Sequence, residues 1–170
     1  MGEEFPQLRR IGIALGSNTG DRLALLEQAC DELSESFGGL RLSQVYETEP
    51  VGCPEGSPPY LNACVEVESA LSPLDVLHRC QEIEQKLGRR RSGVYGEPRT
   101  CDLDLLYVGE LQWHSPELTL PHPRAHLRGF VLRPLADIDP LLVLPGQSQT
   151  VSELLEQLPA DAPSVVPFPL

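Results

Sequence analysis

Apolar and polar positions follow six regular patterns before residue 110. Short apolar or alternating runs, typical of β-strands, occupy residues 10–15, 40–46, 60–69 and 99–108. Apolar residues recur at helical spacing over residues 21–37 and 72–87. The order strand, helix, strand, strand, helix, strand predicts an α+β fold with a ferredoxin-like βαββαβ core. In that core an antiparallel sheet has both helices packed on one face.

Local signals predict where the helices begin and end. Asp21 and the pair Ser72-Pro73 suit helix starts, whereas Gly38 and Gly88 are expected to end the helices. Residues 47–59 hold four prolines and two glycines, so they predict a long loop, of the kind that is usually functional or disordered.

The last third of the chain is less regular. Residues 130–138 are expected to be helical despite Pro134, and residues 150–158 predict a short amphipathic helix that begins with a capping box. The tail, 159–170, has four prolines and is predicted to be disordered. We therefore expect an irregular C-terminal extension on one domain that spans 1–170, with its core at about 10–158.

Charge narrows the classes of function. The net charge is −12, which opposes nucleic-acid and anionic-membrane partners. No apolar run is long enough to cross a bilayer, and the first residues are not a secretory signal, so we expect a cytoplasmic protein, and a monomer. Residues 86–133 nevertheless carry a net charge of +3, against −15 elsewhere. An anionic small ligand is one explanation, and a chance cluster on a solvated face is the other.

The five cysteines show no C-x-x-C spacing, so neither a disulfide framework nor a zinc site is indicated. We interpret Cys30, Cys64 and Cys80, which lie in apolar segments, as buried reduced thiols.

The candidate chemistry centres on Asp102-Leu103-Asp104 in the last predicted strand. Side chains alternate along a strand, so the two carboxylates share a face with Thr100 and Leu106, about 6–7 Å apart. Cys101, Leu103, Leu105 and Tyr107 are expected on the other face. Few, hard oxygen ligands suit magnesium, which shares its shell with phosphates. The alternative is the polar face of a half-exposed strand.

Arginines lie at both ends of the preceding loop. Arg89, Arg90 and Arg91 follow the second helix, and Arg99 precedes Asp102 by three residues. Guanidinium groups bind phosphate oxygens, so carboxylates and arginines together indicate phosphoryl chemistry. The alternative for Arg89–Arg91 is a favourable interaction with the helix C-terminus.

Two weaker signals are consistent with phosphate binding. His122 stands between two prolines, where it either hydrogen-bonds a phosphate or satisfies a loop carbonyl. Gly16-Ser17-Asn18 lies between a predicted strand and helix, like an anion-binding turn, but it is neither a Walker A motif nor a dinucleotide fingerprint.

Seven ordered motifs match one protein family. They are Leu15-Gly16-Ser17-Asn18 with Gly20-Asp21, Tyr46-x-Thr48-x-Pro50-x-Gly52, Tyr60-Leu61-Asn62-Ala63, Leu87-Gly88-Arg89-x-Arg91, Pro98-Arg99-Thr100-x-Asp102-Leu103-Asp104, Leu120-Pro121-His122-Pro123 and Arg128-Gly129-Phe130-Val131. In this order they resemble the 6-hydroxymethyl-7,8-dihydropterin pyrophosphokinases of folate biosynthesis over about residues 11–158. The resemblance implies transfer of pyrophosphate from ATP to the pterin hydroxymethyl group, with release of AMP.

The resemblance also implies roles for single residues. It implies that Asp102 and Asp104 are the ligands of two Mg²⁺ ions. The implied catalytic residues are Asp102 and Asp104 together with Arg89 and Arg99. The implied ATP contacts are Gln81, Glu84, Arg89, Arg91, Arg99, Leu105, Thr119, His122 and Arg128. The implied pterin contacts are Thr48, Pro50, Val51, Tyr60, Asn62 and Phe130, with the rings of Tyr60 and Phe130 on the two faces of the pterin.

The sequence departs from the family pattern at two places. Many relatives have Trp-Gly-Pro-Arg where this chain has Gly96-Glu97-Pro98-Arg99, and Glu117 replaces an arginine of some members. The alternative function is a non-catalytic ferredoxin-like module that binds a small ligand. RNA binding is opposed by the charge and by the lack of an aromatic RNP pattern.

Overall fold

The computed structural model describes residues 7–18, 20–49, 58–91 and 101–169, and for residues 89–91 it describes the backbone alone. The core elements are β1 (Arg9–Ser17), α1 (Arg22–Phe37), β2 (Leu40–Leu42), β3 (Tyr46–Thr48), β4 (Tyr60–Ser69), α2 (Pro73–Arg91) and β5 (Asp102–Val108). After them come β6 (Trp113–His114), β7 (Thr119–Leu120), the 3-10 helix η1 (Ala125–Leu127), α3 (Gly129–Ile138), α4 (Val151–Glu156) and β8 (Val165–Pro167).

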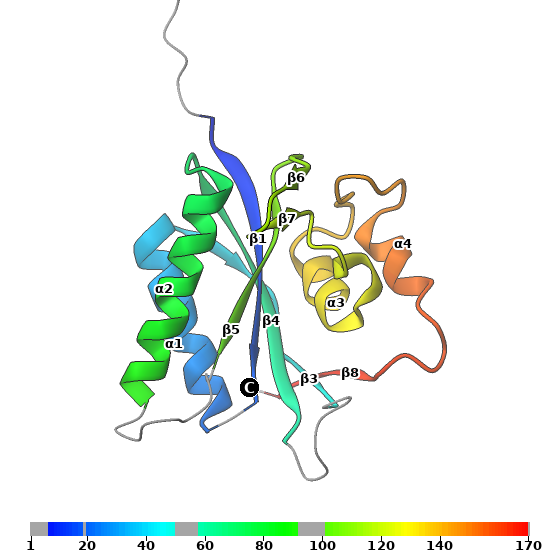
Figure 1. Cartoon of the computed structure of the whole chain (residues 1–170). Helices are drawn as coiled ribbons and strands as arrows, with labels where there is room; N and C mark the ends of the chain where they lie inside the picture. Colours follow the sequence, from blue (N-terminus) through cyan, green and yellow to red (C-terminus); the bar gives the residue numbers. More distant parts are fainter. Residues whose placement is uncertain (1–6, 19, 50–57, 92–100, 170) are drawn as a thin grey trace, which may run out of the picture.

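The sheet is antiparallel throughout, with the strand order β5-β1-β4-β3-β8 and with β2 paired to β4. Helices α1 and α2 cover one face, and α3 and α4 lie on the other (Figure 1). Each face has its own apolar cluster: Ile11, Ile13 and Leu15 point toward α1 and α2, whereas Cys64 and Leu106 pack with α3. The ferredoxin-like prediction is confirmed, and the C-terminal helices add a third layer.

Two predicted helix starts are confirmed in detail. The Asp21 carboxylate accepts a hydrogen bond from the N–H of Ala24, and the Ser72 hydroxyl accepts one from the N–H of Asp75. The predicted end at Gly88 is wrong, because α2 continues to Arg91. Gly88 does not have a positive φ, and the arginines that follow are good helix formers, so the helix extends beyond the glycine.

The predicted second strand is divided into β2 and β3 at Ser43. The N–H of Ser43 donates to the Cys64 carbonyl, while the Cys64 N–H donates to the Ser43 hydroxyl rather than to a backbone carbonyl. A side chain thus replaces one partner of the ladder, and the strand is interrupted.

The tail also differs from its prediction of disorder, since β8 pairs antiparallel with β3. The N–H of Phe168 donates to the Val45 carbonyl, and the Phe168 ring packs at the edge of the core. The proline at position 167 is tolerated because β8 is an edge strand of the sheet in the described part of the chain, and proline is compatible with edge strands.

Cys30, Cys64, Cys80 and Cys101 are reduced, and all but the half-buried Cys30 are buried. Burial raises the pKa of Cys30 to about 11 and that of Cys80 to about 12, so these thiols are inert at neutral pH.

Among the helices that the structure describes, none is long and apolar enough to cross a membrane.

Candidate active site

A cavity of about 490 Å³ lies on the α3 face of the sheet. Its lining includes Asp102 and Asp104 from β5, Tyr60 and Asn62 from β4, and Thr48 from β3. The start of α3 adds Arg128 and Phe130. The structure therefore brings seven of the predicted site residues together around one opening, of a size that suits a small-molecule ligand.

The floor of the cavity is a cross-strand row. Gly16 of β1 lies directly opposite Asp102 on one side and Asn62 on the other. A Cβ atom on Gly16 would lie 3.4 Å from Asn62 Oδ1 and 3.8 Å from Tyr60 Cδ1. Ala14, opposite Asp104, is the next small residue of the row. Because these β1 residues have small side chains, they leave open space in the middle of the cavity floor, between the polar side chains of β4 and β5.

Asp102 and Asp104 are exposed on the cavity face, while the intervening Leu103 is buried against α1 and α2. The predicted alternation is therefore confirmed at these positions. Within the described residues no three His, Cys, Asp or Glu side chains gather to hold a metal. Two carboxylates alone fit a hard divalent ion whose remaining ligands are water and phosphate oxygens, and they do not fit a closed all-protein site.

Asn62 is held by Thr48. Its Nδ2 donates to Thr48 Oγ1 over 2.7 Å, and Asn62 is only 5% exposed. This bond fixes the orientation of the amide, with Oδ1 toward Gly16 and the cavity.

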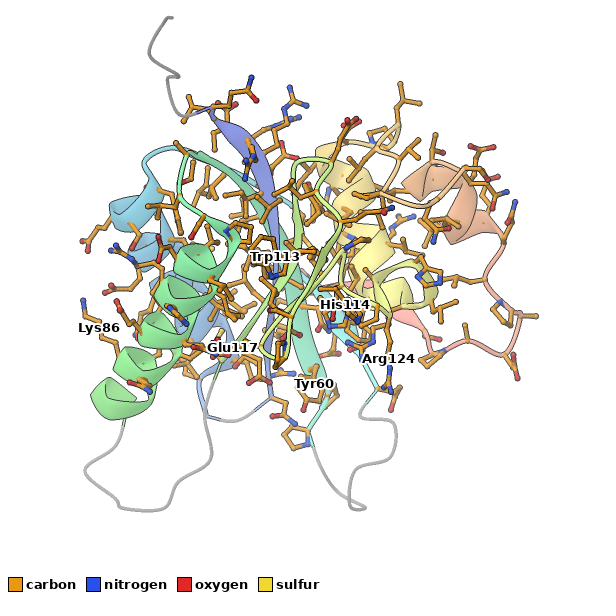
Figure 2. The ribbon with its side chains drawn as sticks, turned by 45° about the horizontal axis from the view of Figure 1, so that its top comes forward. Tyr60, Lys86, Trp113, His114, Glu117 and Arg124 are labelled. Atoms are coloured by element: carbon orange, nitrogen blue, oxygen red, sulfur yellow. The ribbon has the colours of Figure 1, made fainter. Side chains whose placement is uncertain are left out.

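Two aromatic rings reach the cavity from different layers. Tyr60 comes from the start of β4, at the lower end of the sheet in Figure 2, and Phe130 comes from the first turn of α3. The Arg128 guanidinium lies 5.4 Å from the centre of the Phe130 ring, which places a cation against one ring. The arrangement suits a flat ligand between two rings with an anionic group nearby.

His122 lies beside the cavity rather than in its lining. The backbone N–H of His122 donates to the Leu106 carbonyl, and the ring Nδ1 accepts from the backbone N–H of Arg124. Burial lowers the pKa of His122; the Asp104 charge opposes this shift, and Arg128 and Arg124 reinforce it. Burial thus favours the neutral form of the imidazole.

Four further predicted ATP contacts lie outside the cavity lining. Leu105 is buried in the core on the opposite face, and Thr119 pairs with His114 between β7 and β6. Gln81 and Glu84 belong to α2, also on the opposite face (Figure 1). The Glu84 carboxylate accepts a hydrogen bond from the N–H of Leu103 at 2.9 Å.

The remaining predicted site residues lie outside the described part of the chain. They are Pro50, Val51, Arg99 and the side chains of Arg89 and Arg91.

Sequence reasoning missed two parts of the cavity. The first is the floor of the cavity, which is formed by small residues. The sequence does indicate it, because Gly12, Ala14 and Gly16 occupy every second position of an apolar strand. The second is the wall formed by Ala162, Pro163 and Val165 of the tail, which no local pattern reveals.

The fold and the site define a ferredoxin-like protein with a small-molecule cavity beside paired carboxylates. The model of the 7,8-dihydro-6-hydroxymethylpterin-pyrophosphokinase (HPPK) family matches residues 12–140. The chain belongs to this family, which confirms the resemblance of its motifs.

Individual relatives agree. A 2-amino-4-hydroxy-6-hydroxymethyldihydropteridine pyrophosphokinase of Synechocystis sp. is 40% identical over 162 residues, 94% of this chain and 82% of that protein. The Porphyromonas gingivalis protein of the same name is 47% identical over 135 residues, 76% of this chain and 90% of that protein. The HPPK-DHPS crystal structure of Plasmodium falciparum with pteroate matches with a TM-score of 0.71 at 15% identity. The match covers 91% of this chain but 43% of that one, and it supports the fold alone.

Proposed function

We propose that the cavity between the sheet and α3 is the active site at which this pyrophosphokinase works. As a member of the HPPK family, the chain is an ATP-dependent diphosphotransferase of folate biosynthesis. It transfers pyrophosphate from ATP to 6-hydroxymethyl-7,8-dihydropterin and releases AMP. The observation that carries the assignment of the site is that Asp102 and Asp104 share one cavity with Tyr60, Asn62 and Phe130.

We assign the metal-binding role to Asp102 and Asp104, which would hold two Mg²⁺ ions on the triphosphate. Their exposure on one face, and the small residues beside them, leave room for phosphate and water oxygens. Bound divalent ions would supply charge neutralisation and acidification of an attacking hydroxyl. The two carboxylates hold their position because β5 pairs with β1 on one side and is hydrogen-bonded by Glu84 on the other.

The pterin occupies the half of the cavity next to β4 and β3. Tyr60 and Phe130 stack on its two faces, and Asn62 with Thr48 hydrogen-bonds its polar edge. The Asn62 amide is preorganised by its bond to Thr48, so binding the pterin does not require it to be oriented. This half of the site places the hydroxymethyl group toward the carboxylates and keeps water away from it.

ATP binds across the β5 side of the site. Arg128, which lines the cavity, contacts phosphate, and the remaining predicted contacts at Gln81, Glu84, Arg89, Arg91, Arg99, Leu105, Thr119 and His122 stay predictions. The pterin contacts at Pro50 and Val51 also stay predictions.

Four broader statements stay predictions too: that the chain is a single domain, that it is a monomer, that it is cytoplasmic, and that it has no nucleic-acid partner. The net charge of −12 supports the last of them.

The test combines the purified chain with Mg²⁺, ATP and 6-hydroxymethyl-7,8-dihydropterin and identifies the nucleotide product. We expect AMP from the wild type, and a loss of at least about 100-fold in kcat for Asp102→Asn and Asp104→Asn with folding intact. Asp31→Asn, the same change on the exposed surface of α1, is the control. ADP as product would overturn the function. Full activity of both β5 variants would overturn the metal-binding role.

A further inference from the structure

The C-terminal segment forms one wall of the cavity. Ala162, Pro163 and Val165 belong to the lining, and Val165 lies directly opposite Thr48 in the β3–β8 ladder. A Cβ atom on Gly129, the residue before Phe130, would lie 3.4 Å from Val165 Cγ2. The wall therefore touches both the sheet and the helix that carry the proposed pterin contacts.

The strand order places this wall far from the carboxylates. β5, with Asp102 and Asp104, is at one edge of the sheet, and β8 is at the other, with β1, β4 and β3 between them. At about 4.8 Å per strand, the two edges are separated by roughly 19 Å. A change in the wall thus acts on the β3 side of the cavity and not on the carboxylate side.

The wall is fixed in place by more than one strand pair. Beyond β8, the Phe168 N–H donates to the Val45 carbonyl, and the Phe168 ring lies 5.8 Å from the Arg22 guanidinium. Arg22 in turn donates to Glu47 Oε2 at 3.1 Å and to the Pro59 carbonyl at 2.8 Å. One arginine at the start of α1 therefore contacts the tail, β3 and the residue before β4.

We propose that Ala162, Pro163 and Val165 set the size limit of the pterin-binding half of the site, so that the tail is a specificity-determining element of the enzyme. The inference rests on the proposed position of the pterin between Tyr60 and Phe130. The three side chains are small and carry no hydrogen-bonding group, so they discriminate by shape alone. In apolar pockets a single methylene alters discrimination by roughly 10-fold or more.

The experiment replaces Val165 with a smaller and with a larger residue and measures kcat/KM for the natural pterin and for pterins with a methyl, ethyl or propyl group at one ring carbon. Val165→Ala is expected to improve the ratio for the larger pterins over the natural one by about 10-fold. Val165→Phe is expected to raise the KM for the natural pterin by a similar factor, with the KM for ATP unchanged.

Val166→Ala is the matched control, because Val166 is the next residue of the same strand and is 54% exposed. A binding titration with the natural pterin in the absence of ATP accompanies the kinetics, and circular dichroism confirms that each variant is folded. If both Val165 variants behave like Val166→Ala while Asp102→Asn is inactive, the wall is not a specificity element and the proposed active site stands. If the wild type makes no AMP, the proposed function itself fails.

Discussion

The Glu84 carboxylate holds the Leu103 backbone, with 2.9 Å between Oε2 and the amide nitrogen. Leu103 separates Asp102 from Asp104. Among the strands that the structure describes, β5 lies at the edge of the sheet, so none of them pairs with its outward side. Glu84 is 7% exposed. A buried acceptor on α2 thus fixes the stretch of backbone that carries both carboxylates, which makes Glu84 a positioning residue.

Glu84→Ala is expected to lower kcat by more than about 10-fold, because a misplacement of catalytic groups by 1 Å costs up to 10²-fold. It also leaves a buried N–H unsatisfied, at a cost of about 1–3 kcal/mol in the free energy of unfolding. Glu84→Gln retains a carbonyl acceptor, so most of the rate should return. Steady-state kinetics and urea unfolding of both variants measure the two effects. If Glu84 acts instead as a nucleoside contact, both variants will raise the KM for ATP and leave kcat unchanged.

Phe130 is predicted to bind the pterin through its ring. Phe130→Ala should raise the pterin KM at least severalfold, with a smaller effect on the KM for ATP, since a stacked aromatic pair contributes about 0.5–1.5 kcal/mol beyond its buried area. Phe130→Leu separates the two contributions, because it keeps much of the apolar burial and loses the stacking. Titration of pterin into each variant gives the affinities directly. An unchanged pterin affinity in Phe130→Ala would remove the ring from the site.

The faces of β5 could be predicted only as far as Leu105. Gly12 pairs with Tyr107 and Ile13 with Leu105, so Leu106 has no partner in β1 and forms a bulge. The prediction that Tyr107 shares the face of Leu105 is wrong, since a one-residue slip moves Tyr107 to the face of Asp104. Strict alternation gives no sign of such a slip, whereas the two aspartates, which precede it, are placed correctly.

The other features that the sequence did not predict depend on contacts between residues far apart in the chain. Local patterns predicted the β1, β4, α1 and α3 regions, because each is encoded by its own periodicity and caps. The tail resembles a disordered segment because its order depends on β3, which lies more than a hundred residues earlier. The cavity wall formed by the tail could therefore not be predicted, whereas the cavity residues on the strands that carry the family motifs could be.

Tyr107 reaches across Gly12 to a buried acid. A Cβ atom on Gly12 would clash with Cε1 of the Tyr107 ring, so only glycine admits the ring at this position. The Tyr107 hydroxyl donates to Glu66 Oε2 over 2.7 Å, and Glu66 is 4% exposed. Burial and this bond raise the pKa of the Tyr107 hydroxyl above its usual range.

Tyr107→Phe is therefore expected to lower the free energy of unfolding by about 1.5–3 kcal/mol, the contribution of a hydrogen bond to a charged group. Turnover at saturating substrate should stay near the wild-type value, because Tyr107 does not line the cavity. Denaturant unfolding measures the loss. A Tyr107→Phe protein as stable as the wild type would mean that Arg41, which also bonds Glu66, satisfies that carboxylate by itself.

His122 predicts a dependence of stability on pH. An unperturbed histidine titrates near pH 6.5, and burial lowers the pKa of His122 in the folded chain. Between pH 6.5 and that lowered value the unfolded chain binds a proton that the folded chain does not. The free energy of unfolding therefore falls as the pH drops through this window, and it returns as the pH rises to 6.5.

Replacing the His122 imidazole should remove this loss of stability at low pH. We expect His122→Gln, which keeps a polar, uncharged side chain, to lose less stability than the wild type between pH 7 and pH 5. Urea unfolding of both proteins at the two pH values, without metal or nucleotide, gives the comparison, and NMR titration of the ring should have its midpoint below 6.5. Of the charged side chains that the structure describes, Asp104 favours protonation of the imidazole, and Arg124 and Arg128 oppose it. A midpoint above 6.5 would show that the Asp104 carboxylate outweighs burial and both arginines, and the imidazole would then enter the site as a cation.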